Sequence, residues 1–136
     1  FDNAKTDISD GDKDRLIQSL KLLNDGEDIE DVVDVEEVIR YFVVHNFVCN
    51  FDSYTGSMIH NYYLYEEDGQ LSMIPWDYNL AFGTYALGMT NPIKDPNILI
   101  NYPINPPAEG EVMLNRPLYH NIMKHDAYFS KYHAYF

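Results

Sequence analysis

The stretch that decides the fold is HNYYLYEEDGQLSMIPWD, residues 60–77. It holds two runs of β-prone residues, 62–65 and 71–74, and between them lies the pair Asp68-Gly69. An Asp-Gly pair flanked by two such runs is the strongest short-range signal of a β-hairpin. The sequence therefore predicts one antiparallel hairpin in the middle of the chain.

Helical patterns precede the hairpin. Apolar residues recur at helical spacing over residues 16–23, and Gly26 follows as a helix-ending residue. A second helix is expected to begin at Val35, because Asp34 and Glu37 form a D-x-x-E capping box in front of an apolar run. This second helix has a broad apolar face, so we expect it to lie at the centre of the fold and to end near Cys49 or Asn50.

Two shorter helices are expected after the hairpin. Pro117 opens the first of them, and Asp126 is expected to cap the last. Residues 84–115 carry five of the seven prolines, and we expect them to form a long ordered excursion over the surface. The predicted fold class is thus α+β and mainly helical, with residues 1–136 forming a single domain.

Composition excludes several classes of function. Twenty-two acidic and nine basic residues give a net charge of −13, which repels phosphate backbones, so nucleic acid is not an expected partner. No run approaches the ~20 apolar residues of a membrane span. The single cysteine, Cys49, excludes a disulfide framework and a cysteine-rich zinc site. This charge suits a cation or a basic partner better.

Standard metal motifs are absent from the sequence. Aligning Gly11 with the glycine of an EF-hand loop places Thr6 and Ile8 where that loop needs acids, so the calcium pattern fails. The zinc motif H-E-x-x-H does not occur, and His120 and His125 are spaced to point to different helix faces. A metal site in this chain would need a set of ligands other than these two motifs.

Three polar residues occur in an order that suits phosphoryl transfer. Asp52 follows the central helix, Asn61 precedes the hairpin, and Asp77 follows it. A protein kinase has the same order: a catalytic loop with an Asp and then an Asn, a hairpin, and a metal-binding Asp. One carboxylate would receive the proton of the attacking hydroxyl, while an amide and a second carboxylate would hold Mg²⁺ against the phosphates.

The spacing of these residues leaves other interpretations open. Eight residues separate Asp52 from Asn61, whereas the kinase pattern has four, and neither H-R-D nor D-F-G is present. Asp52 could cap a turn, Asn61 could be a strand-edge residue, and Asp77 could be a helix N-cap beside a core Trp76. His60 could be a structural histidine or could help to position phosphate.

The motifs around these residues resemble the CotH family, the spore-coat kinase-like proteins of bacteria. The resemblance is carried by H-N-Y-Y-L-Y at 60–65 and P-W-D-Y-N at 75–79, with support from N-F-D-S-Y at 50–54 and R-P-L at 116–118. It extends from about Leu23 to the end of the chain, and the first two motifs are long and specific.

This resemblance implies a mainly helical, protein-kinase-like C-terminal lobe, with the hairpin between the catalytic loop and the metal-binding Asp. It implies an atypical kinase that uses ATP and Mg²⁺ or Mn²⁺ to phosphorylate Ser on spore-coat or secreted proteins, located in the spore coat or outside the cytoplasm. Asp52 matches the catalytic Asp and Asp77 the metal-binding Asp. Asn61 is assigned as the second metal ligand.

One departure from a complete kinase leaves the activity of this chain open. Residues 1–33 contain no Gly-rich loop and no strand with the phosphate-contacting Lys, which the N-terminal lobe supplies. We therefore expect a fragment of a longer kinase-like protein that is inactive alone and self-associates through exposed apolar surface. The alternative is a non-catalytic structural or interaction module that serves spore-coat assembly.

Overall fold

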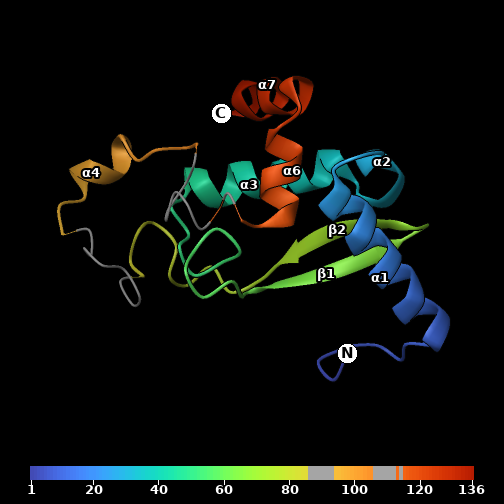
Figure 1. Ribbon diagram of the computed structural model, residues 1–136. Helices are drawn as coiled ribbons and strands as arrows, with labels where there is room; N and C mark the ends of the chain where they lie inside the picture. Colours follow the sequence, from blue (N-terminus) through green and yellow to red (C-terminus); the bar gives the residue numbers. More distant parts are fainter. Residues whose placement is uncertain (86–93, 106–112, 114) are drawn as a thin grey trace.

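The computed structural model describes residues 1–85, 94–105, 113 and 115–136 (Figure 1). Its elements are α1 (Asp10–Asp25), α2 (Ile29–Val32), α3 (Val35–Phe47), β1 (Tyr62–Glu67), β2 (Gln70–Pro75), α4 (Asn97–Ile100), α6 (Pro117–Met123) and α7 (Asp126–Tyr135). Helices combined with a two-stranded antiparallel sheet confirm the expected α+β class. Much of the expected excursion over 84–115 lies outside the described residues.

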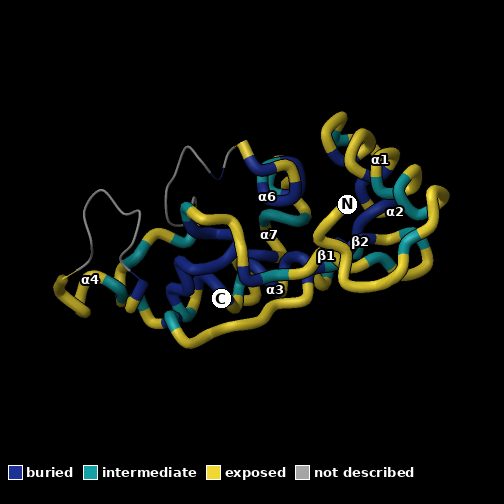
Figure 2. The backbone as a smooth tube through the Cα atoms, turned by 90° about the horizontal axis from the view of Figure 1, so that it is seen from below, coloured by how far each residue is buried: buried dark blue, intermediate teal, exposed yellow. Residues whose placement is uncertain are grey.

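Helix α3 is the centre of the fold, as its apolar pattern predicts. It begins where expected, because the Asp34 side chain accepts a hydrogen bond of 3.0 Å from the Glu37 N–H. Figure 2 shows that the buried residues gather along α3 and the segments around it, whereas much of α1 is exposed. The side chains of this core that are fully inaccessible to solvent are Leu23, Val33, Val38, Ile39, Phe42, Met113, Tyr119, Ile122 and Tyr132.

The hairpin forms in the predicted place. Its strands pair from Tyr62 with Pro75 to Glu67 with Gln70, and the turn residues Asp68 and Gly69 have φ values of 51° and 89°. Positive φ at both turn positions matches the right-handed twist of the strands, which explains the Asp-Gly pair.

One face of β2 attaches the hairpin to the start of α3. Leu71 and Met73 point into the core, and Val33 pairs with Leu71 in a parallel bridge. The Asp34 N–H donates to the Leu71 carbonyl at 3.0 Å, so the residue that caps α3 also binds the sheet. Strand β2 is therefore anchored to the N-terminal end of α3.

The C-terminal helices close the other side of α3 (Figure 1). Phe42 meets the Tyr119 ring edge-on at 5.2 Å, and Asn46 Nδ2 donates to the Tyr132 hydroxyl at 2.8 Å. Pro117 occupies the first turn of α6, as predicted. The N-cap of α7 is His125 rather than Asp126, because Asp126 already has helical geometry and is the first residue of the helix.

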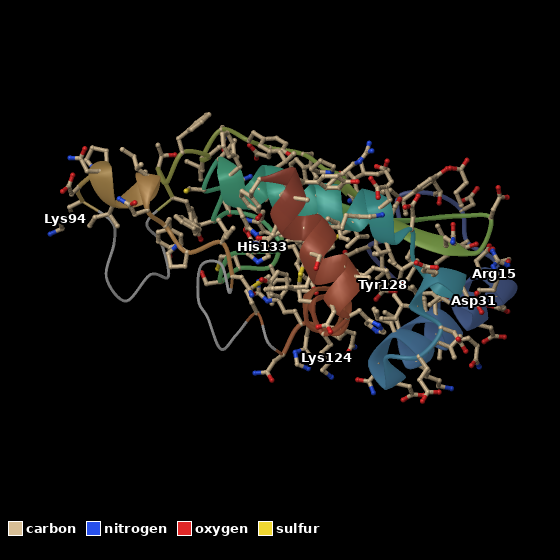
Figure 3. The ribbon with its side chains drawn as sticks, turned by 90° about the horizontal axis from the view of Figure 1, so that it is seen from above. Arg15, Asp31, Lys94, Lys124, Tyr128 and His133 are labelled. Carbon is tan, nitrogen blue, oxygen red and sulfur yellow. The ribbon has the colours of Figure 1, made fainter. Side chains whose placement is uncertain are left out.

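Helices α1 and α2 form the end of the molecule farthest from α4. Figure 3 shows Arg15 and Asp31 at this end and Lys94 at the opposite one. The N-terminus of α1 is held by a capping box between Ser9 and Asp12, and its C-terminus by Gly26, whose φ is 76°. Of the helices described, none combines the length and apolarity that crossing a membrane requires.

Candidate functional site

The loop that leaves α3 is buried in its first part, from Cys49 to Gly56. A buried loop must satisfy its own polar groups, and this one does so largely with itself. The Asn50 carbonyl accepts hydrogen bonds from the Ser53 hydroxyl at 2.7 Å and from the Thr55 hydroxyl at 3.3 Å. The loop is thus a compact support for the residue at its centre.

Asp52 is that central residue, and its side chain is only 8% exposed. Asn61 Nδ2 donates to Oδ2 of Asp52 at 2.9 Å and to its main-chain carbonyl at 2.8 Å. His60 Nε2 lies 2.5 Å from Oδ1. The carboxylate of Asp52 therefore has a nitrogen partner on each oxygen, which compensates for its burial.

At the open end of the hairpin, the residues that follow β2 lie beside Asn61, which precedes β1. The Trp76 N–H donates to the Asn61 carbonyl at 3.1 Å, so Asp77 follows directly after the last contact between the two segments. Asp77 is exposed and has a φ of 58°. No hydrogen bond or ion pair joins its carboxylate to another described residue, and the group is therefore accessible to a ligand.

Main-chain hydrogen bonds join the segment after Asp77 to the segment before Asp52. The Phe82 N–H donates to the Val48 carbonyl at 2.6 Å, and the Gly83 N–H donates to the Cys49 carbonyl at 3.0 Å. The loops that carry the two carboxylates are thus parts of one hydrogen-bonded unit, at the end of the hairpin away from α1 and α2 (Figure 1).

A stack of three rings connects the same two loops to α3. The His45 ring lies between Tyr41, with centroids 3.9 Å apart, and Tyr78, with centroids 5.0 Å apart. The Tyr41 hydroxyl accepts a hydrogen bond from the Tyr54 N–H in the Asp52 loop, and Tyr78 is the residue after Asp77. The stack therefore connects α3 to the loop that contains Asp52 and to the segment that follows Asp77.

His45 must be neutral in this stack. Its Nδ1 lies 2.8 Å from the Tyr41 carbonyl, and Nε2 is buried with no hydrogen-bond partner among the described residues. Burial lowers the pKa of His45 to about 4, because the charged ring would lose its hydration.

This pKa predicts acid sensitivity of the fold. Because the folded-state pKa lies below the unfolded value near 6.5, the stabilising effect is complete above pH 6.5 and is lost as pH falls towards 4. The loss should approach about 3 kcal/mol by pH 4. The free energy of unfolding in urea, determined from pH 7.5 down to pH 4, measures this loss. His45→Phe keeps a ring in the stack and should flatten this part of the profile; an equally steep profile in the variant would contradict the assignment.

Arg116 and Gly56 support the Asp52 loop from the side of α6. Arg116 is buried, and its guanidinium donates to the carbonyls of Tyr54 and, at 2.7 Å, of Gly56. It also lies over the Tyr54 ring, 5.6 Å from the centroid. At Gly56, an added Cβ would overlap the carbonyl group of Phe51. The loop closes this tightly only because glycine is present.

Comparison with known proteins decides the family. A family model described as CotH kinase protein matches residues 1–136, the whole chain. The chain belongs to the CotH kinase family. No curated protein and no solved structure matches it. Membership confirms the resemblance found in the sequence motifs and indicates a kinase-like role for the chain.

The donor set of this CotH chain is compatible with a metal that is completed by phosphates. The described residues contain no group of three or more His, Cys, Asp or Glu side chains that could hold an ion by themselves. Mg²⁺ is usually held by one or two carboxylates together with substrate phosphates, rather than by a complete protein cage. Since Nδ2 of Asn61 is directed to Asp52, its Oδ1 and the exposed Asp77 carboxylate are the oxygens suited to such an ion.

The structure unites some of the residues singled out in the sequence and adds others. Asp52 and Asn61 are in contact, and Asp77 is brought next to Asn61 through the backbone. Trp76 is 45% exposed, so the alternative that makes it a core residue is wrong. The sequence motifs include Arg116 but give no sign of its carbonyl contacts. Only the presence of Arg116 in the R-P-L motif could have suggested that it supports the loop around Asp52.

Proposed function

We propose that this CotH-family chain carries the phosphoryl-transfer centre of an atypical protein kinase that uses ATP and Mg²⁺ or Mn²⁺ to phosphorylate serine on spore-coat or secreted proteins. The single observation that carries the proposal is the buried Asp52 carboxylate, held by Asn61 beside the end of the hairpin that leads to Asp77. The order of α3, loop, hairpin and Asp77 supports a kinase-like C-terminal lobe.

Asp52 is proposed to be the catalytic base. As the serine oxygen bonds to the γ-phosphorus and the bond to the leaving ADP oxygen breaks, the serine hydroxyl proton passes to the Asp52 carboxylate. Each carboxylate oxygen has two lone pairs, and one nitrogen partner per oxygen leaves one lone pair for this proton. The compact loop keeps the group in place without further rearrangement.

Asn61 and Asp77 are proposed to bind the divalent cation. The metal ion would neutralise charge on the ATP phosphates. Asn61 serves two groups in this proposal, because its Nδ2 donates to Asp52 while its Oδ1 remains for the cation. Asp77 contributes a carboxylate that has no partner among the described residues. Its positive φ and its link through Trp76 to Asn61 restrict where this carboxylate can lie.

The non-catalytic alternative is favoured by the outer face of the hairpin. Tyr63 stacks on Trp76 with centroids 5.9 Å apart, and Tyr65 and Ile74 are exposed on the same side. An exposed apolar surface of this kind indicates contact with another protein or another part of the protein. A structural module of the spore coat would use this face without needing Asp77 or a nucleotide.

Calorimetric titration with Mn²⁺ and ATP separates the two proposals. We expect the full-length protein to bind the metal–nucleotide pair, and Asp77→Ala to weaken that binding by about 100-fold or more, because loss of a direct ligand should cost at least as much as loss of an outer-shell partner. Asp31→Ala is the matched control, because Asp31 is an exposed aspartate on α2, away from the site (Figure 3). Equal binding by the Asp77→Ala variant and the wild type would contradict the metal assignment and favour the structural module.

A further inference from the structure

We infer that His60 is a positioning residue that fixes the orientation of the Asp52 carboxylate together with Asn61. The inference rests on the proposed function, because it assumes that Asp52 acts as the base. It gives His60 a role different from a structural histidine or a phosphate-binding one. The observation behind it is the distance of 2.5 Å between His60 Nε2 and Asp52 Oδ1.

The carboxylate of an aspartate can rotate about the Cβ–Cγ bond. Two hydrogen-bond partners on different oxygens prevent this rotation. Asn61 donates to Oδ2, and His60 lies against Oδ1. Asn61 alone would leave the second oxygen without a defined partner. Among the described residues, the side chain that contacts Oδ1 of Asp52 is that of His60. The plane of the proposed base therefore depends on two consecutive residues, His60 and Asn61.

The backbone around His60 is consistent with this role. Ile59 and Asn61, the residues on either side, have φ values of 52° and 59°. Left-handed conformations are unfavourable for residues other than glycine, especially for a β-branched one such as Ile59, and they persist where the surrounding structure demands them. Here they accompany a bend that brings two successive side chains to the same carboxylate.

His60 differs in exposure from His45, the buried histidine of α3. The His60 side chain is 45% exposed, whereas Asp52 beside it is 8% exposed. The ring thus contributes little to the core, and its main contact is the carboxylate. A substitution at His60 should consequently leave the fold intact and act on the carboxylate, which makes the inference testable.

The first arm of the test needs no activity. Side-chain ¹⁵N–¹H spectra of the histidines report the environment of His60 Nε2 directly. Asp52→Ala removes the acceptor and should shift the His60 resonance, while the resonance of His125, exposed at the start of α7, stays in place. An unchanged His60 resonance in Asp52→Ala would overturn the contact and the inference with it.

The second arm measures phosphoryl transfer by the full-length protein. His60→Phe keeps an aromatic ring but removes the nitrogen, and we expect kcat to fall about 10–100-fold with little change in KM for ATP. His60→Gln restores an N–H and should recover much of the rate. His125→Phe is the control. If His60→Phe keeps the wild-type kcat while Asp52→Asn is inactive, the inference about His60 is wrong and the proposed function stands. Absence of phosphoryl transfer by the wild type would instead overturn the proposed function. The spectra would then show whether His60 contacts Asp52.

Discussion

Gly56→Ala should destabilise the protein by about 3 kcal/mol or more, a lowering of the melting temperature by about 10 °C. The added Cβ would overlap the carbonyl group of Phe51, and backbone cannot move aside as the end of a flexible side chain can. Relief requires the loop to open, which would also disturb the contact of Arg116 with the Gly56 carbonyl and displace Asp52. Thermal unfolding followed by circular dichroism measures the effect.

Gly11→Ala is the matched control for this prediction. Gly11 lies in α1, and its added Cβ would meet only the Ser9 hydroxyl oxygen at an ordinary contact distance of 3.6 Å. Alanine favours a helix over glycine by about 0.5–1 kcal/mol, so this variant should be neutral or slightly more stable. A Gly56→Ala protein as stable as Gly11→Ala would show that the loop is not closed as described.

Asp52→Asn should reduce phosphoryl transfer by about 10³-fold in kcat while leaving KM for ATP nearly unchanged. Asparagine has the shape of aspartate, so the loop can keep its fold, but a neutral amide cannot take the proton of the serine hydroxyl. The amide also presents a donor to one of the two nitrogen partners, Asn61 or His60. Initial rates over a range of ATP concentrations separate kcat from KM.

The control for Asp52→Asn is Asp31→Asn. Both variants remove one negative charge, but Asp31 is exposed on α2, at the end of the molecule away from the Asp52 loop (Figure 3). We expect wild-type rates from Asp31→Asn. Similar rates from the two variants would mean that the carboxylate of Asp52 has no part in the reaction and that its burial serves the loop.

Local signals in the sequence predict the secondary structure well. The Asp68-Gly69 pair marks the hairpin because both residues adopt the positive φ that the turn requires. Asp34 marks the start of α3, since the signal and the capping hydrogen bond belong to the same four residues. The capping box of α1 could also have been predicted, because Ser9 and Asp12 lie three residues apart at the start of the helix.

The site is harder to predict because distant contacts decide it. The order of Asp52, Asn61 and Asp77 suggests the chemistry, and the spacing of eight residues between the first two weakens that suggestion. The structure accommodates this spacing by burying the loop and by placing Asn61 in a left-handed conformation against Asp52. Asparagine tolerates this conformation, but nothing in the sequence indicates that the loop is buried or that Asn61 meets Asp52. The contact of Arg116 with Gly56, 60 residues away, depends on the packing of α6.

The central claim is that the Asp52 loop supports phosphoryl transfer from ATP to serine. The most direct test incubates the full-length protein with ATP and Mn²⁺ and detects phosphoserine by mass spectrometry, with Asp52→Asn and Asp31→Asn treated identically. We expect phosphoserine with the wild type and Asp31→Asn, and about 10³-fold less of it with Asp52→Asn at the same early time point. Phosphoserine at equal levels in all three proteins, or in none of them, would contradict this claim.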